Sequence, residues 1–177
     1  MPALGRGLPP KWRLEMSFAT ADLCDQHDDK IKVAEPIFRP YGAHLAFAGR
    51  IATVKVFEDN VLVRQALAEK GEGRVLVVDG GGSLRCALVG DQLAVLARDN
   101  GWSGIVAYGC IRDSAAINTI PIGVRALATH PLKSIKKGAG DRDIPVTFAG
   151  VTFVPNQFLY ADGDGLVLSP VDLGADG

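Results

Sequence analysis

Residues 74–83 read Arg-Val-Leu-Val-Val-Asp-Gly-Gly-Gly-Ser, and this stretch indicates the fold class. Its apolar run, Val75 to Val78, is typical of a strand that is covered on both faces, and the run ends abruptly at the glycines. Residues 88–100 have helical spacing, and residues 104–108 form a second apolar run. Strand, helix and strand therefore alternate, which predicts a layered α/β domain.

The segments on either side fit the same domain. The patterns predict a helix at 20–28 that starts at Thr20, a strand at 47–57, a helix capped by residues 58–60, a short helix from Asp113 to Asn118, a hairpin at 144–154, and a turn at 160–165 before a last strand at 166–168. No linker divides residues 17–177, so we expect one domain there. Residues 1–16 combine three prolines with basic residues and are predicted to be a disordered N-terminal extension or the result of a misplaced start site.

Composition limits the classes of partner. The 177-residue chain has 19 Lys plus Arg against 20 Asp plus Glu, a balance that argues against nucleic acid as the main partner. Its dense basic stretch, Lys133 to Lys137, is interpreted as a solvated loop. The three cysteines have no metal or disulfide spacing, which fits a reducing, cytoplasmic location. No apolar run has the roughly 18–20 residues of a membrane span.

Polar residues that follow two of the predicted strands are the candidates for chemistry. The stretch Gly90, Asp91, Gln92 and Leu93 lies near a helix start, where free backbone N–H groups attract a carboxylate or phosphate. Arg112 can grip a carboxylate with two hydrogen bonds, and Asp113 offers a hard oxygen ligand for Mg²⁺ or Mn²⁺. Together these groups suit the carboxylate and carbonyl oxygen of a 2-oxo acid.

Each candidate also has a purely structural interpretation. Asp113 could cap the helix that follows it, and Arg112 could form a surface ion pair. Residues 80–82 could be a tight turn or a weak phosphate-binding loop, although they match neither the Walker pattern nor the dinucleotide pattern. Asp79 could be structural, and the cysteines and histidines more often serve packing than catalysis.

Several motifs resemble the RraA-like family over residues 17–170. The matching stretches are 75–85, 87–91, 109–113, 53–60, 138–140, 150–154 and 160–165. The resemblance implies a single three-layer β/β/α domain of the swivelling type that forms homotrimers, with hexamers as a further option. One branch of the family is 4-hydroxy-4-methyl-2-oxoglutarate aldolase, a divalent-metal lyase that also decarboxylates oxaloacetate. The other is the regulator of ribonuclease activity A, which binds and inhibits RNase E.

The aldolase pattern is a glycine about twenty residues before Arg-Asp, followed by an acidic residue three positions after the aspartate. Gly90 and Arg112-Asp113 match, whereas Ala116 occupies the acidic position, and the chain lacks the C-terminal extension of the longer aldolases. The resemblance implies that Gly90 to Leu93 and Arg112 bind the substrate carboxylate and that Asp113 holds the metal, Mg²⁺ or Mn²⁺. For the base that aldol cleavage needs, we expect a water held by acidic residues such as Asp91.

The expected activity is that of a class II pyruvate aldolase and oxaloacetate decarboxylase, which works through a pyruvate enolate. The alternative is a non-catalytic regulator of RNase E. Methyl transfer from S-adenosylmethionine, a role once assigned to some family members, is not expected because the sequence contains no motif for that cofactor.

Overall fold

The structure, a computed structural model, describes residues 17–174, so the predicted N-terminal extension lies outside the described residues. The helices are α2 (Thr20–Gln26), α3 (Val61–Leu67), α4 (Asp91–Asp99) and α5 (Ser114–Ile117). The strands are β1 (Lys32–Val33), β2 (Arg39–Tyr41), β3 (Phe47–Lys55), β4 (Val75–Asp79), β5 (Ala87–Val89), β6 (Gly104–Ile111), β7 (Gly123–Thr129), β8 (Asp141–Arg142), β9 (Val146–Phe148), β10 (Val151–Phe153), β11 (Phe158–Ala161) and β12 (Leu166–Ser169).

The large sheet has the order β1-β12-β11-β3-β4-β6-β7-β2 and curls at its long strand β3. The first part of β3 pairs antiparallel with β11, and its second part, from Ile51 to Lys55, pairs parallel with β4. Strands β3, β4, β6 and β7 run parallel, so their carboxyl ends meet at one edge. This edge is called the carboxyl edge below.

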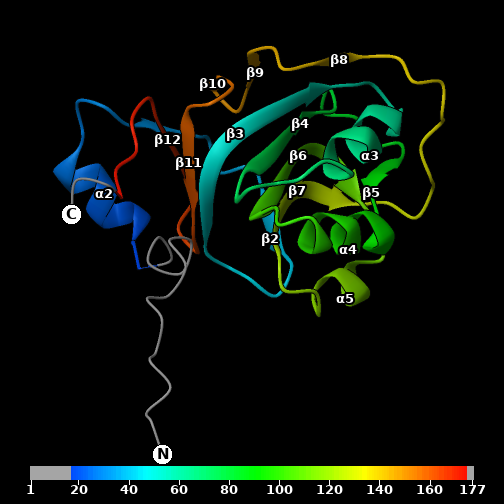
Figure 1. Ribbon diagram of the computed structural model, residues 1–177, viewed down its shortest axis with the longest axis horizontal. Helices are drawn as coiled ribbons and strands as arrows, with labels where there is room; N and C mark the ends of the chain where they lie inside the picture. Colours follow the sequence, from blue (N-terminus) through cyan, green and yellow to red (C-terminus); the bar gives the residue numbers. More distant parts are fainter. Residues whose placement is uncertain (1–16, 175–177) are drawn as a thin grey trace, which may run out of the picture.

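Three layers result, as Figure 1 shows. Helices α3, α4 and α5 cover one face of the parallel strands, and the curled strands β11 and β12 with the β9–β10 hairpin cover the other. Helix α2 packs outside, on β12. The molecule is therefore a single mixed α/β domain of β/β/α layers, in agreement with the predicted fold class.

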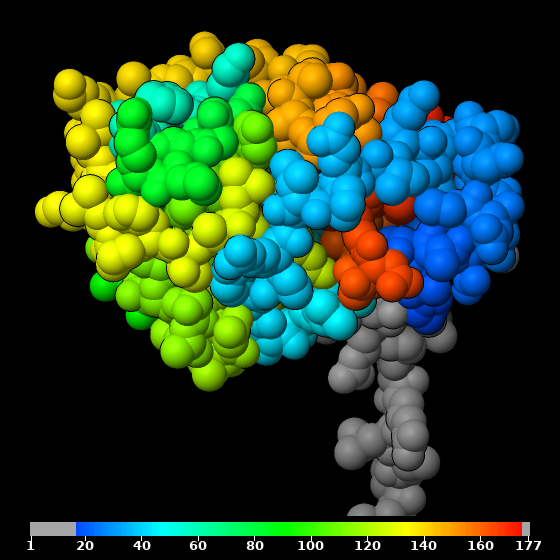
Figure 2. Space-filling view, turned by 180° about the vertical axis from the view of Figure 1, so that it is seen from behind, coloured from blue at the N-terminus to red at the C-terminus, as the bar shows by residue number. Residues whose placement is uncertain are grey.

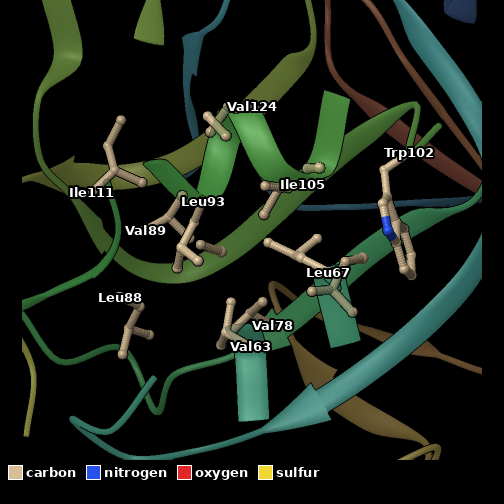
Figure 3. Packing of buried hydrophobic residues seen from close by; sticks show 14 of the residues in the cluster. Val63, Leu67, Val78, Leu88, Val89, Leu93, Trp102, Ile105, Ile111 and Val124 are labelled. Carbon is tan, nitrogen blue, oxygen red and sulfur yellow. The ribbon is translucent and has the colours of Figure 1, made fainter. Parts of the chain in front are cut away.

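The core beneath the helices explains why these segments fold as they do. All five residues of β4 are buried, as a strand covered on both faces requires. Val63 and Leu67 from α3 and Leu93 from α4 pack on the sheet, as Figure 3 shows. Burial of each such side chain contributes roughly 1.5–3 kcal/mol to the stability of the fold.

The structure corrects several predicted boundaries and contains strands that were not predicted. The turn predicted at 160–165 begins only after Ala161, because Tyr160 and Ala161 belong to β11. The helix predicted at 88–100 begins only at Asp91, because Leu88 and Val89 belong to β5, which pairs with β6. This pairing buries both side chains and outweighs the local helical spacing. Strand β7 was not predicted at all. The hairpin, the last strand and the helix at Thr20 are confirmed, although Thr20 is the first helical residue and Ala19 is the cap. Among residues 17–174, no helix has both the length and the apolarity to cross a membrane.

Candidate functional site

A cavity of about 230 Å³ lies at the carboxyl edge, where β5 and β6 end and α4 begins. It is lined by Asn60, Arg64, Ala87, Gly90, Asp91, Gln92, Leu93, Arg112, Asp113, Lys133, Ser134 and Lys136. All six residues that were predicted as site residues from the sequence thus border one cavity. The structure adds six residues that were not predicted as site residues: Asn60, Arg64, Ala87, Lys133, Ser134 and Lys136.

The first turn of α4 offers N–H groups to the cavity. The backbone N–H of Asp91 donates to Oδ2 of Asp113 at 3.3 Å, and that of Gln92 donates to Oδ1 of Asp91 at 2.8 Å. The N–H of Leu93 has no acceptor within residues 17–174. Two of these amides thus already accommodate carboxylate oxygens of the protein, which is the chemistry expected of an anion cradle at a helix start.

Arg112 and Asp113 follow β6 directly and face this cradle. Nε of Arg112 lies 4.0 Å from Oδ2 of Asp113, and the side chains are 42% and 44% exposed. Asp113 has a φ of 57° and a ψ of 40°, a left-handed conformation that is costly for a residue other than glycine. It stands at the N-cap position of α5, yet its side chain makes no capping hydrogen bond. The carboxylate is therefore directed to the cradle and not to its own helix.

Gly90, at the start of the α4 cradle, lies close to Arg112 and Asp113. A Cβ atom at this position would lie 2.9 Å from Oδ2 of Asp113 and 3.6 Å from both Cγ and Nε of Arg112. The backbone angles of Gly90, φ −118° and ψ −173°, are open to any residue. Glycine therefore leaves room for the Asp113 carboxylate at its present position, whereas any larger residue would force that carboxylate to shift.

The third wall of the cavity is residues 133–137, called the basic arm below. The side chains of Lys133 and Lys136 are exposed, as expected for a solvated loop, but both also line the cavity. The basic arm follows β7, the strand that the sequence analysis missed. If β7 had been predicted from the sequence, the basic arm that follows it would have been predicted at the carboxyl edge as well.

Asp59 and Asn60, which follow β3, hold the basic arm in place. Oδ2 of Asp59 accepts hydrogen bonds from three consecutive backbone N–H groups, those of residues 137–139, at 2.9, 2.8 and 3.2 Å. Its Oδ1 accepts from the N–H of Val61 at 3.0 Å. Burial raises the pKa of Asp59, but these four donors lower it by more, so the pKa lies below its ordinary value.

Asn60 joins the basic arm to β5. Its Nδ2 donates to the carbonyl of Leu88 at 3.0 Å, and its Oδ1 accepts from Nζ of Lys136, also at 3.0 Å. Residues 58–60 were predicted only as a helix cap. They also tie together the segments that form the cavity.

Charge in the cavity favours an anion. Its lining contains four cationic side chains, those of Arg64, Arg112, Lys133 and Lys136, and two carboxylates, those of Asp91 and Asp113. The excess of positive charge matches a ligand with more than one negative group.

The other candidate residues lie outside this cavity. Oδ1 of Asp79 accepts from the N–H of Gly81 at 2.9 Å, so this aspartate stabilises the glycine turn. Gly81 and Gly82 have positive φ values of 66° and 72°, a conformation that glycine adopts without steric cost, which explains why glycine occupies both positions. Cys86 and Cys110 are buried, and burial raises the pKa of both thiols, as expected of packing residues.

The carboxylates of the cavity suit a cation that retains most of its water. Residues 17–174 contain no cluster of three or more His, Cys, Asp or Glu side chains that could enclose a metal ion. Mg²⁺ commonly binds through one or two carboxylates, with water and substrate as the other ligands. Asp113, half-exposed at the cavity and with one long hydrogen bond to Oδ2, fits that mode.

The chain is similar to known proteins over most of its length. The RraA-like family (Aldolase/RraA) matches residues 20–168. A protein of Laribacter hongkongensis is 64% identical over 155 residues, 88% of this chain and 98% of that protein. One of Aromatoleum aromaticum is 64% identical over 158 residues, covering 89% and 99%. Both carry the provisional name 4-hydroxy-4-methyl-2-oxoglutarate aldolase.

Solved structures are similar to this chain in both sequence and fold. The RNA-processing inhibitor RraA of Thermus thermophilis superposes with a TM-score of 0.85 at 47% identity, covering 88% of this chain and 94% of that one. A Geobacillus kaustophilus protein described as an S-adenosylmethionine:2-dimethylmenaquinone methyltransferase gives a TM-score of 0.88 at 52% identity, covering 90% and 99%. The match of sequence and fold over nearly the whole described chain means that this protein belongs to the RraA-like family.

Proposed function

We propose that the protein is a lyase that breaks a carbon–carbon bond of a small 2-oxo acid, with assistance from a divalent metal. The observation that carries the proposal is the convergence of the α4 cradle, Arg112 and Asp113 on one cavity with excess positive charge. The aldolase names of the relatives support the same reaction class. The substrates we propose are 4-hydroxy-4-methyl-2-oxoglutarate and oxaloacetate.

The residues of the chain divide the work as follows. The N–H of Gln92, in exchange for its bond to Asp91, and the N–H of Leu93, which has no acceptor among the described residues, bind the carboxylate next to the 2-oxo group. The Arg112 guanidinium donates hydrogen bonds to the 2-oxo oxygen. When the carbon–carbon bond breaks, its electron pair moves into an enolate of pyruvate, and the negative charge on that oxygen is stabilised by Arg112. A proton then returns to the enolate carbon to give pyruvate.

The two substrates differ in the proton that must be removed. In aldol cleavage the distal hydroxyl loses its proton, and Asp91 is the cavity carboxylate that we assign to hold a water for this step. Oxaloacetate loses carbon dioxide without such a base. We therefore expect decarboxylation to depend less on Asp91 than aldol cleavage does.

Asp113 is the residue that we assign to the metal. Mg²⁺ or Mn²⁺ bound there would supply Lewis-acid polarisation of the 2-oxo group. Oδ2 of Asp113 lies 3.3 Å from the backbone N of Asp91 in the cradle, so one substrate can contact both.

The decisive experiment is oxaloacetate decarboxylation by the purified protein with Mg²⁺ or Mn²⁺. Activity should disappear with EDTA, in Asp113→Ala and in Arg112→Ala, because each change removes part of the enolate-stabilising site. An unchanged rate in either variant would show that the chemistry takes place elsewhere.

A second candidate function is regulation of RNase E by protein binding. Exposed apolar side chains at the carboxyl edge favour a protein partner: Phe57, Leu84, Leu132 and Ile135 are each more than half exposed. Figure 2 shows the segments around residues 80 and 135, in green and yellow, on one face. We also propose that the chain forms a trimer, which analytical ultracentrifugation tests. Capture of RNase E by the wild type but not by Leu84→Asp would favour the regulator.

A further inference from the structure

Ser134, at the centre of the basic arm, has a hydroxyl that the protein itself leaves unused. The residue is 4% exposed and lines the cavity, and its Oγ has no hydrogen-bond partner among the described residues. A buried hydroxyl without a partner is unfavourable, and such groups are rare in folded proteins. Rotation about χ1 toward the cavity would break no hydrogen bond.

The position of Ser134 is nevertheless firmly fixed. The N–H of Ile135 donates to the carbonyl of Glu58 at 2.9 Å, and Asp59 holds the three amides that follow Lys136. On the other side, the carbonyl of Leu132 accepts from the N–H of Ala87 at 2.8 Å. Backbone hydrogen bonds thus hold both sides of an unsatisfied donor, which is how a binding group is preorganised.

We propose that Ser134 is a substrate-binding residue whose hydroxyl donates to the second carboxylate of a dicarboxylic 2-oxo acid. The inference rests on the proposed function, in which the α4 cradle takes the carboxylate next to the 2-oxo group and Arg112 takes the 2-oxo oxygen. The second carboxylate then lies toward the basic arm, beside the ammonium groups of Lys133 and Lys136. Ser134 thereby favours dicarboxylic over monocarboxylic 2-oxo acids.

The test uses Ser134→Ala and measures binding by calorimetry with two acids, 2-oxoglutarate and pyruvate. The dissociation constant for 2-oxoglutarate should rise about tenfold, whereas that for pyruvate, which has no second carboxylate, should not change. The melting temperature of the free variant should be equal to that of the wild type or higher, because the substitution removes an unpaired buried hydroxyl.

Ser103→Ala is the matched control. Oγ of Ser103 donates to the carbonyl of Gly73 at 2.7 Å, at the opposite end of the sheet. The control should lower the melting temperature and leave both dissociation constants unchanged.

The outcomes separate this inference from the proposed lyase activity. Unchanged 2-oxoglutarate binding in Ser134→Ala, or a fall in melting temperature as large as that of the control, overturns the role of Ser134, even in an active lyase. A selective loss of 2-oxoglutarate binding in a protein without decarboxylase activity supports the role of Ser134 and refutes the lyase. A wild type that binds neither acid overturns both.

Discussion

Gly90→Ala separates the function of the site from the stability of the fold. The added Cβ would lie 2.9 Å from Oδ2 of Asp113, so the carboxylate must move by about 0.5 Å to reach the 3.4 Å of an ordinary contact. Because the Asp113 side chain is 44% exposed and rotatable, this movement is inexpensive. The backbone angles of Gly90 suit alanine, so we expect the free energy of unfolding to change by less than about 1 kcal/mol.

Catalysis should be far more sensitive than stability. A misplacement of about 1 Å in an active site can reduce the rate a hundredfold, so a shift of half that size predicts a loss of at least about tenfold in kcat/KM. The new methyl group also occupies the approach of the substrate carboxylate to the α4 amides. The expected loss is therefore about 10- to 100-fold.

The assay is metal-dependent oxaloacetate decarboxylation, measured beside urea denaturation of the same preparations. Gly123→Ala serves as the control, because its Cβ would overlap the ring of Phe47, which is 1% exposed. That variant should lose about 3 kcal/mol of stability by overpacking. Full activity in Gly90→Ala, or a loss explained by unfolding, would refute the assignment of the cradle.

Three further predictions concern charge. Asp59→Asn should raise the KM for oxaloacetate about tenfold, because the substitution releases the basic arm. Asp162→Asn is the control: Asp162 is bonded to Thr20 and lies away from the cavity, so this variant should change stability without changing KM. Because the pKa of Asp59 is lowered in the folded state, its contribution to stability is present above about pH 4 and lost as pH falls, so the acid unfolding of Asp59→Asn should be less steep. Lys136→Met should weaken 2-oxoglutarate binding more than pyruvate binding, as calorimetry would show. Burial raises the pKa of Tyr160 to about 12, so stability should fall by roughly 2 kcal/mol as pH rises from 10 to 12, and Tyr160→Phe should abolish that part of the decline in urea denaturation.

The parts of the fold that could be predicted have patterns that only one structure satisfies. The run Val75–Val78 is too short for a helix and too apolar for a loop, and it is a buried strand. Strand β7 was missed because Arg125 interrupts its apolar run. The structure buries this guanidinium, which donates to the carbonyls of Leu45 and Asp162. No local pattern shows that a charge in mid-strand will find such partners.

The site was predicted only in part, because some of its residues adjoin elements that the sequence predicts and others do not. Gly90, Arg112 and Asp113 stand beside recognisable strand and helix ends, so their meeting at the carboxyl edge could be expected. The basic arm follows the strand that was missed, and its exposed lysines resemble any solvated loop. Its place depends on Asp59, whose bonds to residues 137–139 cross nearly 80 positions of the chain. Contacts of that separation leave no periodic trace in one sequence.

Ala116 marks where this chain departs from the aldolase pattern, and the structure limits the consequence. Ala116 is exposed on α5 and is not among the residues that line the cavity. The carbonyl of Ala116 accepts hydrogen bonds from the N–H and the hydroxyl of Thr119, as is usual at the end of a helix. The cradle, Arg112 and Asp113 therefore do not depend on an acid at this position. Enolate stabilisation should survive the departure, while a step that needs an additional base should suffer, so oxaloacetate decarboxylation should exceed aldol cleavage in this protein.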